Sequence, residues 1–348
     1  GGTDGVLLAL ISSLATIVIL VSAFIVAALV CRDETFTDII DVVASVQIVQ
    51  TAGKLNRGGT PAFMLTFYRY LSVLTLDVDF LQPGCSLGSS FMVVFFGSFA
   101  LMIFVAVTAV SIILSVGWAR ASIIRRKEGA DAGDSACAWS KNRLIRVLVL
   151  IPVLLYINLT YRSLQAVTCA ETSSGESVLV ADPTIQCYTG NHVMIAVVAW
   201  LSLVVISAGL PVAVGVFLVL QFKRGQLFDP QTKARYGYFY EELRINSFWF
   251  FLATITTELA LTVCSVVFES DPLLQFAVAG SFLVVFIGLV VVRRPFRKML
   301  ENALAVGAAV VSLIGQSLNL ALGLELAMSS RVLLGLSLLI FVLVVTIL

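Results

Sequence analysis

The stretch Phe91–Gly117, FMVVFFGSFALMIFVAVTAVSIILSVG, runs for 27 residues without a charged side chain. A helix that crosses a bilayer needs about 20 mostly apolar residues, so this stretch is long enough to span one. Similar stretches recur along the 348 residues, of which 59% are hydrophobic and only 12% are charged. A soluble domain could not bury so much apolar surface. We therefore predict an all-α, polytopic helical membrane bundle.

The spans are predicted from apolar stretches separated by short polar segments. The piece 36–52 is weaker than the others, because its apolar residues recur at helical spacing beside a polar stripe. It could cross the membrane against other helices or lie along the interface. The nine spans of this single transmembrane domain, 1–348, lie near residues 6–30, 36–52, 91–117, 147–167, 193–221, 248–268, 273–292, 303–322 and 332–348.

Basic residues alternate between the predicted loops. Segments 118–146, 222–246 and 293–298 hold 7, 5 and 4 of the 22 Lys and Arg residues, whereas 168–192 and 269–272 hold none. Because cytoplasmic loops are enriched in Lys and Arg, the basic loops are expected inside. Nine spans with the N-terminus outside satisfy every loop. The alternative is eight spans, with Cys31 outside.

Both ends of the chain indicate a piece of a longer protein. The start, GGTDG, has no Met and no basic region, so 6–30 does not read as a signal peptide. The chain also ends within an apolar stretch. An upstream ectodomain and a downstream tail are therefore expected.

The cysteines fit this sidedness. Cys169 and Cys187 flank the acid-rich segment on the predicted outer side, where disulfides persist, so a bridge between them is expected. The alternatives are two free thiols, or a bridge from Cys85 to one of the two. There is no CxxC pattern and His192 is the only histidine, so no structural metal or haem site is predicted.

Motifs of soluble enzymes are absent from the sequence. It contains no GxxxxGK[ST], no dinucleotide-binding GxGxxG and no HExxH. We therefore expect no enzyme, no cofactor and no nucleic-acid partner. The expected partners are the lipid bilayer and extracellular or oligomeric protein contacts.

Polar residues inside predicted spans carry the functional signal, because they are costly in a membrane. Glu258 lies mid-span, and Thr254 and Thr262 lie four residues to either side, on the same helical face. Such a face could line a cation path or bind a neighbouring helix by hydrogen bonds. Two further polar pairs are candidates: Gln316 and Asn319, for which packing is favoured, and Asp77 and Asp79, which form either a cation-attracting rim or a helix cap.

A segment rich in aromatic residues precedes the span at 248–268. It reads Tyr236-Gly-Tyr-Phe-Tyr-Glu241, with Trp249 at the start of the span, and Arg294-Pro295-Phe296 follows the next span. Together with an outer Asp77-Val-Asp79-Phe…Cys85 element, this pattern resembles the transmembrane domain of fungal-type TRP-like proteins and related C-terminal membrane domains of large algal and protist surface proteins. The resemblance covers residues from about 40 to 325. The aromatic cluster is also a plausible interfacial anchor. The motif comprises Tyr236, Gly237, Tyr238, Phe239, Tyr240, Glu241, Trp249, Arg294, Pro295 and Phe296.

The resemblance implies a channel-like or transport-linked domain of a plasma or other eukaryotic cell-surface membrane. One expectation is therefore a TRP-like cation channel or channel-related transporter, with Glu258 near the path. The alternative is a membrane anchor or receptor-like base for an extracellular assembly, in which the polar faces only pack. The first predicts a hydrated space that reaches Glu258, and the second predicts a dry bundle.

Overall fold

The computed structural model describes residues 45–51, 91–128, 130–172 and 175–323. These residues are mostly helical, and six of their helices are long and apolar enough to cross a membrane. The six match the predicted spans from 91–117 to 303–322. Predicted spans 6–30 and 332–348, most of 36–52, and residues Asp77 and Asp79 lie outside the described residues. The total of nine spans and the orientation of the N-terminus therefore stay predictions.

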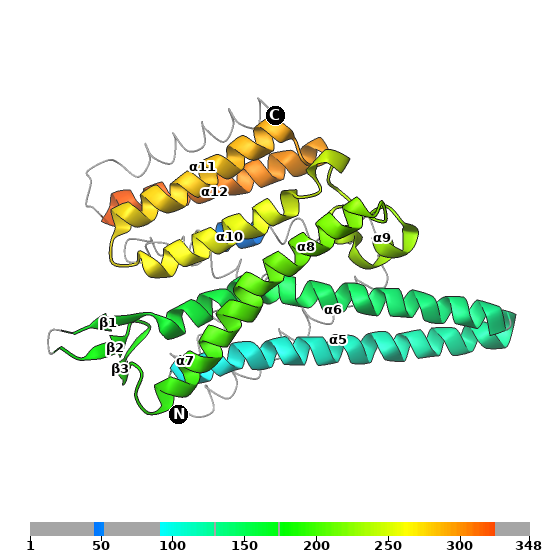
Figure 1. The fold of residues 1–348 in the computed structure, drawn as a ribbon, viewed down its shortest axis with the longest axis horizontal. Helices are drawn as coiled ribbons and strands as arrows, with labels where there is room; N and C mark the ends of the chain where they lie inside the picture. The colour runs from blue at the N-terminus through cyan, green and yellow to red at the C-terminus, as the bar shows by residue number, and fades with distance from the viewer. Residues whose placement is uncertain (1–44, 52–90, 129, 173–174, 324–348) are drawn as a thin grey trace, which may run out of the picture.

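The two longest helices form a hairpin that extends well past the rest of the molecule (Figure 1). Helices α5, Phe91–Glu128, and α6, Ala130–Val167, have 38 residues each. At 1.5 Å per residue each is about 57 Å long, almost twice the hydrocarbon thickness of a bilayer. The sequence predicted a loop at 118–146, and this prediction is wrong. The segment is polar, but its Ala, Arg, Lys and Glu residues are strong helix formers.

The predicted loop 168–192 contains a small antiparallel sheet. Strands β1, Cys169–Glu171, β2, Ser177–Leu179, and β3, Asp182–Gln186, pair in the order β1-β2-β3, so the mostly helical fold also contains a small sheet that was not predicted. Asp182 links the sheet to the start of α5 by accepting a hydrogen bond from the Phe91 N–H at 3.3 Å. The hydroxyl of Thr184 also donates to Asp182, at 2.6 Å, and this bond is the main reason that the pKa of Asp182 is lowered.

The next span is one long helix with a π-helical centre. It consists of α7, Asn191–Ser202, the π-helix η3, Leu203–Ala208, and α8, Gly209–Lys223. In Figure 1 it crosses the α5–α6 hairpin diagonally.

Short polar elements lead into the last three spans. They are α9, Pro230–Tyr236, and the 3-10 turns η4, Gly237–Phe239, and η5, Ile245–Ser247. Helices α10, Phe250–Val267, α11, Pro272–Arg293, and α12, Met299–Gly323, follow. The sequence Asp-Pro starts both α9 and α11. Asp229 and Asp271 cap the first turns by accepting backbone N–H bonds, and the proline at the first helical position needs no donor there.

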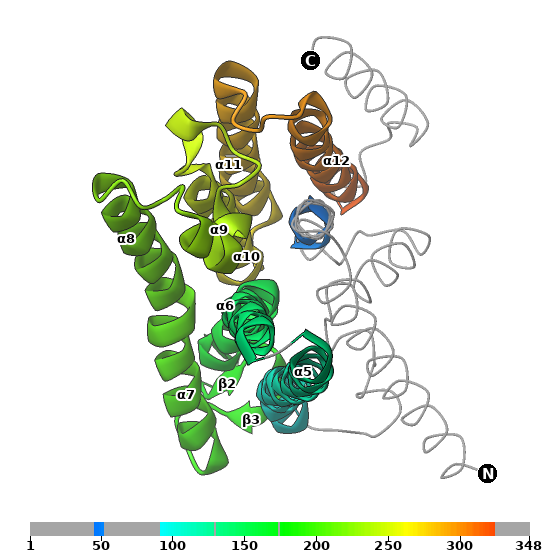
Figure 2. The ribbon, with the colours of Figure 1, turned by 90° about the vertical axis from the view of Figure 1, so that its right-hand side faces the viewer.

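Helix α6 is the centre of the described bundle, packed against α5, α7, η3, α9 and α10. The helical segment 45–51 lies between α6 and α12 (Figure 2), and the side-chain amide of Gln47 donates to the Leu154 carbonyl of α6 at 2.6 Å. The helix ends alternate (Figure 1): the three basic segments gather at one end, which we call the basic end. The sheet and the turn at 269–272 lie at the other, which we call the sheet end.

Candidate functional site

Glu258 lies inside the bundle. This location fits both roles that the sequence left open for it, a cation path and helix packing. Its side chain is 4% exposed, and its Oε1 atom has no hydrogen-bond partner among the described residues. Thr262 and Thr254 do not pair with the carboxyl group. Their hydroxyls donate to the carbonyls of Glu258 and Phe250, one turn back, at 2.8 and 3.3 Å. One oxygen of the carboxyl group is therefore buried without a hydrogen bond from the described residues.

Glu258 has a polar neighbour on another helix. Its carboxyl group lies within electrostatic range of Tyr156 on α6. The Tyr156 hydroxyl donates to the Ser207 carbonyl at 3.0 Å, and the hydroxyls of Thr160 and Ser207 lie 2.8 Å apart. Tyr156, Thr160, Ser207 and Glu258 are all buried and join α6, η3 and α10; we call them the polar core. The sequence singled out only Glu258, because Ser, Thr and Tyr are common in membrane helices.

The π-helix explains why Ser207 can take part in the polar core. In a regular α-helix the Ser207 carbonyl would accept the N–H of residue 211, but that residue is proline and has none. The Tyr156 hydroxyl replaces the missing donor. Gly209 permits the bulge, because a Cβ atom there would lie 3.2 Å from the Val204 carbonyl oxygen. Single π-helical turns of this kind are frequent at functional sites.

The second predicted polar face lies on a different helix and does not join the polar core. Gln316 and Asn319 are both buried on α12, which packs against α11. Both amide atoms of Gln316 lack a hydrogen-bond partner among the described residues.

The aromatic motif is brought together at the basic end, although its two parts are more than fifty residues apart. Leu243 and Phe296 form an antiparallel bridge. The Arg244 N–H donates to the Pro295 carbonyl at 2.7 Å, and the Arg297 N–H donates to the Glu242 carbonyl at 2.8 Å. We call this pairing of 240–244 with 294–302 the basic-end clasp. Arg294 makes it possible, because its left-handed backbone (φ 44°) ends α11 and turns the chain back.

Asn302 stabilises the second part of the clasp, residues 294–302, by hydrogen bonds. Its side-chain oxygen accepts the Phe296 N–H at 3.3 Å, and its side-chain nitrogen donates to the carbonyls of Phe296 and Lys298, both at 3.0 Å. Lys298 in turn pairs with Glu242 at 3.5 Å and with Glu301 at 3.1 Å. The amide thus orders the second part of the clasp, and the ion pair of Lys298 with Glu242 joins it to the first part.

Gly237 and Glu241 of the aromatic motif contact each other. The Glu241 N–H donates to the Gly237 carbonyl at 2.6 Å, and the Glu241 carboxylate pairs with Lys233 of α9 at 2.9 Å. A Cβ atom on residue 237 would lie 2.8 Å from Glu241 Oε2, so a larger residue there would require the Glu241 side chain to move. Tyr240 donates its hydroxyl to the Leu227 carbonyl, and burial raises the pKa of Tyr240 well above its usual range.

The clasp closes one side of a cavity of about 250 Å³. Its walls are mostly apolar and aromatic, with Phe239, Phe250, Phe286 and Phe296 among them, and the ion pairs of Lys298 lie at its edge. Thr254 also lines the cavity, whereas Glu258, one turn further along α10, does not. Within the described residues, the cavity therefore stops one helical turn short of the polar core.

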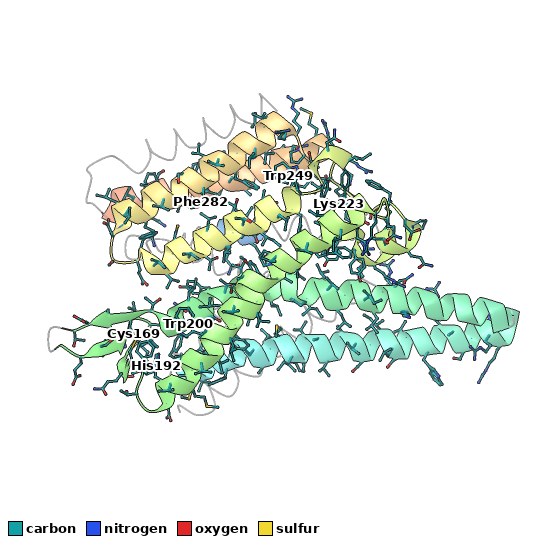
Figure 3. All side chains as sticks on the ribbon, in the orientation of Figure 1. Cys169, His192, Trp200, Lys223, Trp249 and Phe282 are labelled. Carbon is teal, nitrogen blue, oxygen red and sulfur yellow. A yellow bond between two sulfur atoms is a disulfide. The ribbon has the colours of Figure 1, made fainter. Side chains whose placement is uncertain are left out.

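The sheet end holds the predicted disulfide. Cys169 and Cys187 are bonded to each other, so this prediction is confirmed. Figure 3 shows Cys169 and His192 at this end, with Lys223 and Trp249 at the other. His192 is 1% exposed: its Nδ1 accepts the Tyr188 N–H at 2.9 Å, and its Nε2 lies 3.1 Å from the Ala166 carbonyl.

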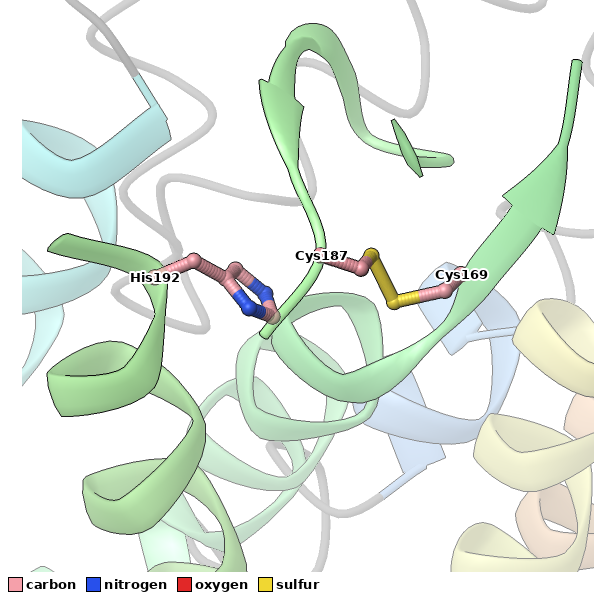
Figure 4. A group of neighbouring side chains, drawn as sticks. All are labelled: Cys169, Cys187 and His192. Carbon is pink, nitrogen blue, oxygen red and sulfur yellow. A yellow bond between two sulfur atoms is a disulfide. The ribbon is translucent and has the colours of Figure 1, made fainter. Parts of the chain in front are cut away.

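Although the ligand atoms of Cys169, Cys187 and His192 lie within 4.8 Å of one another (Figure 4), the two sulfurs are bonded and both imidazole nitrogens are used. The group fits a structural clip rather than a metal centre.

No protein-family model, curated protein or solved structure matches the chain.

Proposed function

We propose that this chain is the membrane domain of a TRP-like cation channel or channel-related transporter, and that the polar core borders its ion path. The observation that carries the proposal is the buried Glu258 carboxyl group with its unpaired Oε1 atom. The three elements that meet there include a π-helix. We further propose a plasma or other cell-surface membrane as its location.

The physical reason lies in the cost of unpaired polar groups. Moving a carboxyl group from water to an apolar medium without a hydrogen bond costs several kcal/mol, and far more if it is ionised. A bundle that only anchors a protein gains nothing from keeping such a group, whereas a carboxylate that water or a cation reaches in a working state stabilises that cation. Ser163 and Ser202 also have buried hydroxyls without a partner among the described residues, on the neighbouring elements α6 and α7.

One observation favours the alternative of a membrane anchor or receptor-like base. The 250 Å³ cavity reaches Thr254 but is not lined by Glu258. A dry interior at Glu258 is what that alternative predicts.

The two functions are separated by a flux assay on the purified chain in liposomes. Glu258→Gln preserves the shape of the side chain and removes its charge. If the polar core borders a cation path, this variant should change cation flux or cation selectivity by about tenfold, which corresponds to a barrier change of about 1.4 kcal/mol. Glu269→Gln is the matched control, because it makes the same replacement in the turn after α10.

The control should conduct like the wild type. Wild-type liposomes that conduct no cation above the empty-liposome background would favour the anchor. If the Glu258→Gln variant conducts with unchanged size, selectivity and pH dependence, Glu258 does not border the path. That result would contradict the role of the polar core.

A further inference from the structure

A groove of about 560 Å³ lies between α5 and α6 toward the basic end of the hairpin. Trp118, Arg125 and Arg126 of α5 line it, and Lys141 of α6 closes it from the opposite side. Gly117 forms part of the wall without contributing a side chain, which keeps the groove open at that level. The sequence marked this segment only as a basic loop.

The side chains of the groove are chemically one-sided. Among the described side chains that line it, three are basic and none is acidic. Trp118 is 78% exposed, so its indole faces outward from the hairpin. An exposed indole beside basic side chains is typical of the interface between hydrocarbon and phospholipid headgroups.

The length of the hairpin places the groove at headgroup depth. Trp118 follows Phe91, at the sheet end of α5, by about 40 Å of helix at 1.5 Å per residue. Lys141 precedes Val167, at the sheet end of α6, by about the same length. A bilayer measures about 30 Å across its hydrocarbon and about 40–45 Å with its headgroups, so Trp118 and Lys141 lie at headgroup level. The backbone of Arg125 and Arg126 lies about 10–12 Å further along α5, and helical side chains tilt toward the N-terminus of their helix, which brings long guanidinium side chains back toward that level.

We propose that this groove binds the headgroup of a phospholipid that carries a phosphate monoester, in the leaflet at the basic end. A phosphomonoester holds up to two negative charges and three acceptor oxygens, and two guanidinium groups with one ammonium group supply matching donors and charge. The single phosphodiester of ordinary phospholipids would use this donor set only in part. Trp118 lies nearer the sheet end than the two arginines, so its indole is expected to contact the glycerol and the first methylenes of the same lipid. This site does not depend on ion conduction or on Glu258.

The test is native mass spectrometry of the purified chain in detergent, with phosphatidic acid, a phosphoinositide, phosphatidylserine or phosphatidylcholine added. We expect the two phosphomonoester lipids to bind at least tenfold more tightly than the other two. Replacing Arg125, Arg126 and Lys141 by Ala should weaken that binding by about 100-fold, since each basic side chain near a lipid surface contributes roughly one factor of five.

A matched control removes the same charge from the same end of the molecule. Lys223, Arg224 and Arg293 are exposed there and do not line the groove. Their triple Ala variant should bind the phosphomonoester lipids within threefold of the wild type. Since a triple variant can misfold, the charge-preserving variant Arg125→Lys, Arg126→Lys is measured beside it and should retain selective binding at reduced affinity.

Three outcomes would overturn the assignment. Equal loss in the control variant would mean general charge attraction at the basic end. Equal binding of all four lipids by the wild type would mean that no phosphate monoester is recognised. Displacement of the lipid by soluble inositol phosphate or glycerol phosphate at equal concentration would assign the groove to a free phosphate compound.

Discussion

At the scale of single residues, the polar core shows how one missing hydrogen bond shapes its surroundings. Pro211 deprives the Ser207 carbonyl of its helical donor, and Tyr156 from another helix supplies the replacement. The hydroxyls of Thr160 and Ser207 then lie close enough to bond, at 2.8 Å. The π-helix η3 thus contacts Tyr156, which also lies near the buried Glu258. Because each polar group there is buried, the loss of one partner should be costly.

Tyr156→Phe tests this dependence. The variant leaves the Ser207 carbonyl without a donor, so we expect the free energy of unfolding to fall by about 1–3 kcal/mol in detergent. Pro211→Ala restores an N–H at the position that a helical bond needs. In the double variant the loss caused by Tyr156→Phe should therefore shrink. Tyr188→Phe is the control, because that side chain is 59% exposed, and strictly additive effects would contradict the shared role of Tyr156 and Pro211.

At the scale of elements, the basic-end clasp ties α10, α11 and α12 together where their chains leave the bundle. It combines backbone pairing, the Asn302 amide and the ion pairs of Lys298. Phe250 at the start of α10 lies against both Phe286 and Phe296, with ring centroids 5.6 and 5.5 Å apart. A movement of α12 would therefore be transmitted to the start of α10. The clasp thus connects the motif of the sequence resemblance to the helix that bears Glu258.

Asn302→Ala should loosen this connection. The variant removes three hydrogen bonds, two of which bind carbonyls that then lose a partner, so we expect about 1–3 kcal/mol lower stability. Asn246→Ala makes the same replacement at an exposed position in the same region. Thermal unfolding of both variants in detergent gives the comparison. Equal melting temperatures for the two variants would show that the amide does not hold the clasp.

The sequence predicted those elements that follow from local composition. Apolar length finds the six described spans, although α5 runs 11 residues past its predicted end and α6 begins 17 residues before its predicted start. The Asp-Pro starts of α9 and α11 were not predicted. The clasp was predicted only as a set of motif residues, since its pairing joins positions such as Leu243 and Phe296 that no periodicity connects. The sheet was missed because its strands have only three to five residues. The donor to Ser207 comes from another helix, so the polar core beyond Glu258 could not be derived.

At the scale of the whole molecule, charge and fold agree on two distinct ends. The three basic segments gather at one end, whereas the disulfide-linked sheet lies at the other (Figure 1). Disulfides persist outside the cytoplasm, and Lys and Arg accumulate inside it. Two independent rules therefore favour the same orientation, with the sheet end outside.

Cysteine labelling of intact cells tests this orientation. Cys31, Cys85 and Cys137 are replaced by Ser to lower the background; Cys264 is buried, and Cys169 is bonded to Cys187. Glu176, between β1 and β2, and Gln226, between α8 and α9, are both exposed. The sheet and the end of α8 lie at opposite ends of the molecule (Figure 1). A membrane-impermeant maleimide should label Glu176→Cys in intact cells and label Gln226→Cys only after permeabilisation. The reverse pattern would mean that the bundle is inverted, and the phosphomonoester groove would then face the outer leaflet. Labelling of both positions in intact cells would contradict the alternation of the spans itself, because an odd number of crossings separates residue 176 from residue 226.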